Sequence, residues 1–178
     1  MIIGVTGLIG SGKSTAAAFL AGRLGARIID ADKLGHLVLK QNKFVRRGLK
    51  IIFGSAGRKV IAAQAFASPL KLFLLNTLTH PFICRRILRE IQGAPENLII
   101  DAPLLFQTGL HKYCDRIIFV TADEKSIRHR LAARGYSAEQ IDRRLSASQK
   151  VCRYKSKADK IFANSGSLAA LRRLAYIF

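Results

Sequence analysis

The stretch GLIGSGKST, from Gly7 to Thr15, fits the pattern G-x-x-x-x-G-K-[ST]. Glycines in such a loop permit backbone angles that turn successive N–H groups toward an anion, and a helix that begins there adds its positive end. In this pattern Lys13 reaches the β- and γ-phosphates of a nucleoside triphosphate such as ATP, and the Ser14 hydroxyl holds Mg²⁺. The residues predicted to surround the phosphates are Gly10, Ser11, Gly12, Lys13, Ser14 and Thr15.

Three carboxylates follow short apolar runs, although the chain has only 11 acidic residues against 30 Lys and Arg. Asp30 and Asp32 come directly after Ile28 and Ile29, and Asp101 ends the run NLIID. Ligands of open α/β folds bind at the carboxyl ends of strands, so these acids are candidates for catalysis. Asp101, at the end of its strand, is a candidate metal ligand. Other roles stay open for each acid. Asp30 or Asp32 could be a helix N-cap, Asp30 could contact Mg²⁺ indirectly, and Asp101 could be a turn residue.

Short apolar runs alternate with helical patterns along the chain. This order predicts a parallel sheet with helices on both faces, a three-layer α/β/α fold. The expected strands are Ile2 to Thr6, Ala26 to Ile29, Asn97 to Asp101, Arg116 to Val120 and Lys160 to Ala163. The expected helices are Ser14 to Leu24, several between residues 30 and 92, Asp123 to Ala133, Ser137 to Tyr154 and Leu168 to Tyr176.

The helical stretch between the second and third strands is too long for a simple crossover, which predicts an inserted subdomain. We therefore expect a single domain whose core comprises about 1–30, 93–133 and 158–178. The helical substrate insertion is expected at about 31–92, and a small basic lid at about 134–157.

The chain of 178 residues has a formal charge of +19 and 49% hydrophobic residues, which indicates a globular protein with anionic partners. Three widely spaced cysteines without a C-x-x-C pair favour free thiols in a reducing cytoplasm. We expect no signal peptide, because a strand-like run begins at once, and no membrane association, because charges interrupt the apolar stretches. The sequence carries no signal for an oligomeric state.

The order of the glycines argues against a Rossmann dinucleotide site, which needs G-x-G-x-x-G and uses no Lys-Ser pair. A GTPase would carry N-K-x-D, but Asn42-Lys43 continues with Phe44-Val45. A nucleic-acid-binding ATPase stays open, because a charge of +19 suits a phosphate backbone. The chain has no Trp and only 8% aromatic residues, which offers little surface for stacking bases. We therefore expect no specific nucleic acid as a partner. A small-molecule kinase needs an acid that activates the acceptor, a substrate subdomain, and cations that neutralise the transferring phosphoryl group. This sequence has candidates for all three.

Four motifs follow in a specific order: the glycine loop with IIDADKLGHLVL, then LTHPFI, DAPLLFQTGL with CD, and ADKIFANSGSL. Together they resemble the dephospho-CoA kinase family over residues 1 to about 170. The resemblance implies a P-loop kinase fold with a five-stranded parallel sheet, a helical substrate domain and a lid. It also implies transfer of the γ-phosphoryl group of ATP to the ribose 3′-hydroxyl of dephospho-CoA with Mg²⁺, the last step of coenzyme A synthesis.

By this resemblance Asp32 is the general base and Arg134 the lid arginine that closes over the phosphates. His36, Arg58 and His80 would lie on the substrate side, and Asn164 near adenine. For either histidine a structural hydrogen bond stays open, and for Asn164 a turn role. Four residues depart from the family pattern, Leu8, Gln107, Gly135 and Ala163. We expect Arg85, Arg86 and Arg89 to form a solvated face.

Overall fold

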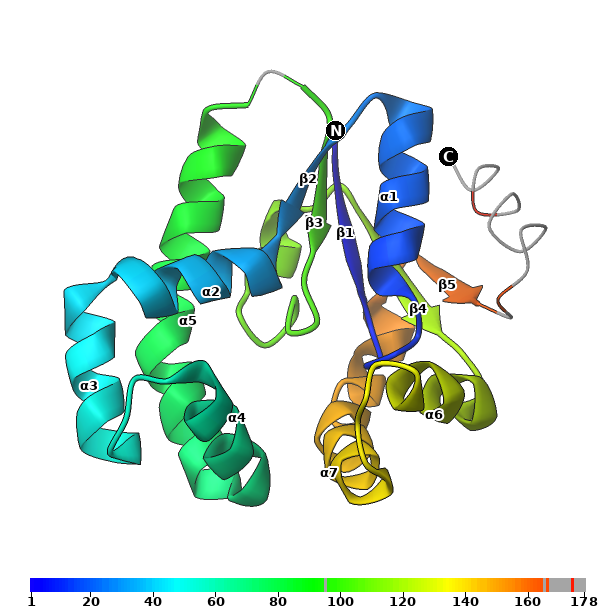
Figure 1. Ribbon diagram of the computed structural model, residues 1–178. Helices are drawn as coiled ribbons and strands as arrows, with labels where there is room; N and C mark the ends of the chain where they lie inside the picture. Colours follow the sequence, from blue (N-terminus) through cyan, green and yellow to red (C-terminus); the bar gives the residue numbers. More distant parts are fainter. Residues whose placement is uncertain (95, 165, 167–173, 175–178) are drawn as a thin grey trace. The chain divides into compact units, whose positions relative to one another are not determined.

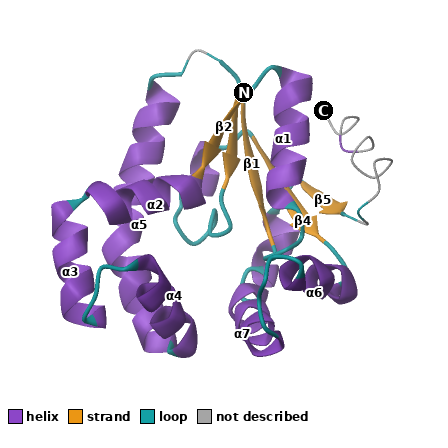
Figure 2. Cartoon of the chain, in the orientation of Figure 1, coloured by secondary structure: helices purple, strands orange, loops and turns teal. Residues whose placement is uncertain are grey.

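The computed structural model describes residues 1–94, 96–164, 166 and 174, and in this part of the chain five strands form one parallel sheet (Figures 1 and 2). Their order across the sheet is β2-β3-β1-β4-β5. The strands are β1 (Ile2–Gly7), β2 (Arg27–Asp30), β3 (Leu98–Asp101), β4 (Arg116–Thr121) and β5 (Lys160–Ala163). Each strand begins and ends within one residue of its predicted bounds, and the α/β class with a five-stranded parallel sheet is confirmed.

The register of the central strands brings acidic residues together at the carboxyl edge. Asp101 of β3 pairs with Val5 of β1 on one side and with Asp30 of β2 on the other. Paired residues of neighbouring strands point to the same face of a sheet. The side chains of Asp30 and Asp101 therefore share one face at the end of the sheet where the glycine loop begins.

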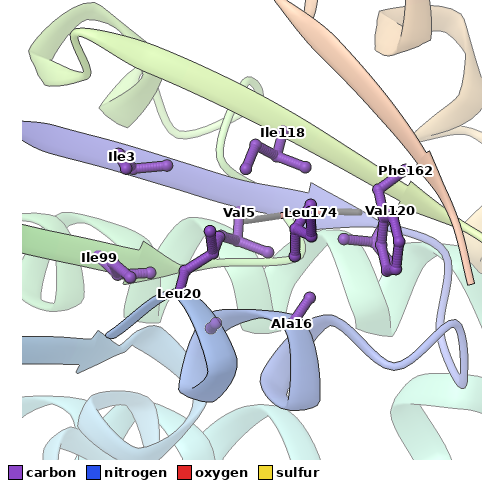
Figure 3. Close-up of a cluster of buried hydrophobic side chains, with 10 residues drawn as sticks. Ile3, Val5, Ala16, Leu20, Ile99, Ile118, Val120, Phe162 and Leu174 are labelled. Carbon is purple, nitrogen blue, oxygen red and sulfur yellow. The ribbon is translucent and has the colours of Figure 1, made fainter. Parts of the chain in front are cut away.

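Helix α1 (Lys13–Leu24) packs on the sheet through a stripe of small and apolar residues, which Figure 3 shows. Ala16 and Leu20 lie one turn apart and contact a cluster that includes Val5, Ile118 and Phe162, all nearly inaccessible to solvent. Burying a side chain of this size contributes about 1.5–3 kcal/mol. The predicted last helix, Leu168 to Tyr176, lies outside the described residues except for Leu174, which is buried in the same cluster.

The chain divides into two compact units, residues 1–30 with 93–178, and residues 31–92. The second unit consists of four helices, which confirms the helical character predicted for this stretch. They are α2 (Ala31–Gln41), α3 (Lys43–Phe53), α4 (Arg58–Ala67) and α5 (Pro69–Gln92). Val45, Leu49 and Phe53 recur every four residues along α3 and form the core of this unit with Ile61 and Ala65 of α4. The substrate role predicted for the unit stays a prediction.

The segment after β4 forms α6 (Glu124–Ala132) and α7 (Ala138–Gln149). Ser137 and Gln140 make a reciprocal capping box that fixes the start of α7. The predicted helix from Ser137 to Tyr154 is wrong at its end, because Cys152–Lys157 forms a 3-10 helix instead. Here Val151 is buried, and the Tyr154 ring stacks on Phe106 with centroids 5.0 Å apart, so packing redirects a segment whose local pattern would continue the helix.

Candidate active site

The loop between β1 and α1 is shaped to hold an anion at the helix start. Gly12 is the N-cap of α1 in a left-handed conformation, and no side chain caps the helix. The first turn of α1 also contains no acidic residue. The unpaired N–H groups and the positive end of the helix dipole are therefore available to phosphate oxygens.

Two glycines are required by space as well as by backbone angle. A Cβ atom at Gly12 would collide with the side-chain amide of Asn164, and one at Gly7 would collide with the carbonyl oxygen of Val120. Both residues have positive φ, 90° and 138° respectively. The phosphate loop is thus packed directly against the strands and loops beside it, which fixes its shape before any ligand binds.

The loop and the start of α1 contribute four polar side chains, those of Ser11, Lys13, Ser14 and Thr15. The Nζ atom of Lys13 donates to the carbonyl oxygen of Leu8 at 2.8 Å, which holds the lysine over the loop. Ser14 and Thr15 are exposed in the first turn of α1. Among the described residues, the buried hydroxyl of Ser11 has no hydrogen-bond partner. A buried hydroxyl without a partner is costly, so this atom fits a site whose ligand supplies the missing partner.

The carboxyl edge offers hard oxygen ligands for a divalent cation. Asp101 is 5% exposed at the end of β3, and a buried carboxylate is stable only beside cations or hydrogen-bond donors. Together with the Ser14 hydroxyl, this donor set is of the kind that Mg²⁺ prefers. Within the described residues no group of three or more His, Cys, Asp or Glu side chains is arranged to hold a metal. A Mg²⁺ ion here would take its remaining ligands from phosphates and water.

A second set of contacts, absent from the sequence predictions, braces the phosphate loop from β5. The side-chain amide of Asn164 is buried and donates to the carbonyl oxygen of Ser11 at 2.7 Å. Arg130 of α6 donates to the same carbonyl oxygen at 3.2 Å, to that of Gly10 at 3.3 Å and to that of Asn164 at 3.3 Å. Asn164 was predicted to lie near adenine, and in the structure its side chain donates to the loop backbone at Ser11 and accepts from the Gly166 N–H.

Helices α6 and α7 are also attached to the phosphate loop. Leu8 and Ile9 pack against the apolar cluster that the two helices bury, and the Ile9 N–H donates to Ser148 Oγ at 2.9 Å. Leu8 is one of the departures from the family pattern, where a glycine is usual. Its side chain therefore adds a contact between the loop and the predicted lid.

The arginines of α6, of α7 and of the turn between them differ in what they contact. Arg128 pairs with Glu124 and Asp142, and Arg143 pairs with Glu139. Arg134 is exposed in the turn after α6, and within the described part of the chain no ion pair involves it. Because Arg134 has no local carboxylate partner, it is better suited to reach a phosphate than Arg128 or Arg143.

The predicted substrate-side residues lie on three helices of the second unit. Asp32 is in the first turn of α2, with His36 one turn later on the same face, and both are exposed. Because α2 begins at Ala31, Asp32 is inside the helix, and Asp30 precedes it. Arg58 is the first residue of α4, and His80 lies within α5. Burial lowers the pKa of His80, which favours the neutral imidazole.

Two further departures from the family pattern lie in the first unit. Gln107 stands where an acid is usual, and its side-chain oxygen is buried without a hydrogen-bond partner among the described residues. Ala163 is exposed at the end of β5, directly before Asn164.

None of the helices in the described ranges has the length and apolar character needed to cross a bilayer.

Comparisons with known proteins agree with this geometry. A family model described as dephospho-CoA kinase matches residues 1–170. A dephospho-CoA kinase from Corynebacterium diphtheriae is 35% identical over 187 residues, which cover 98% of this chain and 93% of the relative. One from Dehalococcoides mccartyi is 40% identical over 159 residues, covering 82% of this chain and 79% of the relative. The crystal structure of TT1252 from Thermus thermophilus is 31% identical, with a TM-score of 0.78, and covers 100% of this chain and 98% of that chain.

Proposed function

Because the chain belongs to the dephospho-CoA kinase family, we propose that it transfers the γ-phosphoryl group of ATP to the ribose 3′-hydroxyl of dephospho-CoA. The products are coenzyme A and ADP, so the reaction is the last step of coenzyme A synthesis. The observation that carries the proposal is the phosphate loop, whose uncapped helix start and buried Ser11 hydroxyl fit a triphosphate inside a chain that matches the family over residues 1–170.

Catalysis in such a site rests on positioning and on neutralising charge. Lys13 contacts the β- and γ-phosphates, while the N–H groups of the loop hold the triphosphate in line with the acceptor. Ser14 and Asp101 would hold Mg²⁺, and Asp30, which shares a sheet face with Asp101, would contact its water shell. When bound, Mg²⁺ neutralises negative charge that builds up on the transferring phosphoryl group.

The acceptor side is assigned to the helical unit. Asp32, in the first turn of α2, accepts the proton of the 3′-hydroxyl as the oxygen attacks phosphorus. His36, Arg58 and His80 bind dephospho-CoA. A neutral His80 both donates and accepts a hydrogen bond, which suits a ribose or amide better than a phosphate.

Arg134 closes over the phosphates from the lid, and its lack of a described ion pair leaves its guanidinium available for that contact. We place the enzyme in the cytoplasm, where ATP is abundant and where three cysteines without a disulfide are stable. ATP and dephospho-CoA are its proposed small-molecule partners.

The test combines an acceptor panel with one matched pair of variants. ATP turnover is measured with dephospho-CoA, with other nucleosides and nucleotides, and with RNA or DNA, and only dephospho-CoA is expected to stimulate it strongly. Asp32→Asn is expected to lower kcat about 100-fold or more while leaving the Kd for ATP within about twofold. Asp115→Asn is the control, because Asp115 accepts from the Ile2 N–H at the opposite end of β1 and an asparagine oxygen can do the same.

Stimulation by nucleic acid alone would overturn the proposed reaction. Near-normal turnover of Asp32→Asn with dephospho-CoA would instead leave the reaction intact and remove Asp32 from it.

A further inference from the structure

The helical unit has a groove between the C-terminal half of α2 and the C-terminal half of α5. Its volume is about 630 Å³, within the range of small-molecule sites. Three arginines of α5, Arg85, Arg86 and Arg89, line it together with one acid, Glu90. Three positive charges against one negative give the charged side chains of the lining a formal sum of +2. The groove therefore favours an anion.

Ion pairing and helix capping do not account for these arginines. Arg86 donates to the Gln41 side chain at a long 3.4 Å. For the residues that the structure describes, no ion pair to Arg85 or Arg89 is found. Arg89 lies in the last turn of α5, where its charge complements the helix dipole. That effect fades within one turn, so it does not account for Arg85, which lies seven residues before the end of the helix at Gln92.

The rest of the lining is apolar and aromatic. Leu37 and Val38 of α2 and Phe82 of α5 line the same groove. The ring of Phe44 lies 6.0 Å from that of Phe82 at an angle of 44°, and Phe44 is 68% exposed. An exposed aromatic ring beside arginines suits the planar or apolar part of a ligand whose anionic part pairs with the guanidinium groups.

A helix start also lies at the groove. Asn42, the N-cap of α3, lines it, and its side-chain oxygen accepts from the Val45 N–H. The first turn of α3 contains no acid. The positive end of an 11-residue helix thus adds to the potential of the arginines rather than opposing it.

Helical periodicity separates this groove from the proposed acceptor residues. At about 100° per residue, Leu37, Val38 and Gln41 lie on roughly the opposite side of α2 from Asp32 and His36. The same count places the groove residues of α5 on roughly the opposite side from His80. The two sets of side chains point away from each other on both helices, so one ligand that contacts Asp32, His36 and His80 does not fill the groove.

We propose that this groove is a second ligand site that binds an organic phosphate, such as a nucleoside diphosphate. The phosphates pair with Arg85, Arg86 and Arg89, and the planar or apolar part lies against Leu37 and Phe82. Guanidinium groups match phosphate oxygens in geometry and stay charged at all physiological pH values. The site does not depend on which acceptor the enzyme phosphorylates.

The experiment is a residue-resolved NMR titration of the full chain, whose mass of 19.6 kDa suits the method. ADP and inorganic pyrophosphate are the two probes. With ADP, we expect amide shifts in two separate groups, one at residues 7–15 and one at residues 37–42 and 82–90, with different Kd values. Tighter binding of ADP than of pyrophosphate at the groove supports the proposal, because the planar part of ADP then adds affinity, and equal Kd values of the two probes overturn it.

Two variants and one control test the assignment of the arginines. The double variant Arg85→Glu with Arg89→Glu is expected to weaken ADP binding at the groove at least tenfold and to leave the shifts at residues 7–15 unchanged. If this variant is less stable than the wild type, Arg85→Gln with Arg89→Gln replaces it. Arg23→Glu reverses one exposed charge on α1 and leaves both groups of shifts.

We expect the kcat and KM values of the double variant for ATP and dephospho-CoA to stay within about twofold. Shifts at residues 7–15 alone in the wild-type chain would overturn the proposal. So would groove shifts caused by duplex DNA but not by ADP or pyrophosphate, or a tenfold rise in the KM for dephospho-CoA in the double variant.

Discussion

Replacing Asn164 with alanine tests whether the brace on the phosphate loop does what its geometry indicates. The side chain is 5% exposed, donates to the Ser11 carbonyl at 2.7 Å and accepts from the Gly166 N–H at 3.0 Å. The Asn164→Ala variant loses both hydrogen bonds. At about 1 kcal/mol each, with a further contribution from the small cavity, the free energy of unfolding falls by about 2–3 kcal/mol. For a chain of this size the Tm falls by about 4–12 °C.

The same variant is expected to bind ATP less well. Arg130 still donates to the Ser11 carbonyl, so the loop loses one of two braces and not both. If one hydrogen bond of about 1–1.4 kcal/mol biases the loop toward its binding conformation, its loss raises the KM for ATP about 5- to 10-fold. The KM for dephospho-CoA changes by less than about twofold, because the Asn164 side chain braces the loop that holds ATP.

Asn97→Ala is the matched control. Asn97 also makes two side-chain hydrogen bonds, accepting from the N-terminal amine at 3.0 Å and donating to the Leu24 carbonyl at 3.2 Å, but at the amino end of the sheet. Urea unfolding and a coupled ADP assay measure both variants. We expect Asn97→Ala to lose stability without a change in the KM for ATP. An equal KM for ATP in the two variants would refute the bracing role of Asn164.

Three shorter predictions concern the lid, one cap and one thiol. Leu8→Ala weakens the contact between the loop and the lid helices, so amide hydrogen exchange in residues 124–149 rises about tenfold while that of β1 stays unchanged. The hydrogen bonds from the Ser126 N–H and hydroxyl lower the pKa of Asp123, so the stability that its charge contributes is present above about pH 4 and lost as the pH falls further. Thermal melts of wild type and Asp123→Asn differ at pH 7, and the difference shrinks as the pH falls below about 4; a constant difference contradicts the cap. Burial raises the pKa of Cys114 to about 12, so iodoacetamide at pH 8 labels the exposed Cys152 and spares Cys114 in mass spectra, and equal labelling refutes this.

Much of the fold follows from patterns that span fewer than about 20 residues. The run IIGVT followed by glycines and then by STAAAFLAGRL predicts a buried strand, a phosphate loop and a helix, because each is governed by local backbone angles and by the period of its apolar residues. The same reasoning finds all five strands. It misplaces the end of α7, because Val151 is buried there and the Tyr154 ring stacks on Phe106, which lies far away in the sequence.

The chemistry-bearing residue types of the site are also evident in the sequence. Lys13 and Ser14 follow from the glycine pattern, and Asp32 and Asp101 from their position after apolar strands. Their roles stay predictions, as does the role of Arg134 in the lid, but each lies in the kind of element that was expected. The sequence alone thus indicates which side chains are candidates for binding a triphosphate, and it locates the ends of the strands that precede them.

Only the tertiary structure decides what holds those side chains in place. Asn164 and Ser11 are 153 positions apart and meet because β5 is the second strand from β1 in the sheet, an order that no local pattern specifies. Asp30 faces Asp101 because β2 and β3 pair in one particular register. Arg85 and Arg89 are exposed, as the sequence predicts for a solvated face, and they also line a groove because α2 packs beside their helix. Local rules fix backbone conformation and periodicity, whereas these contacts depend on which distant surfaces bury each other.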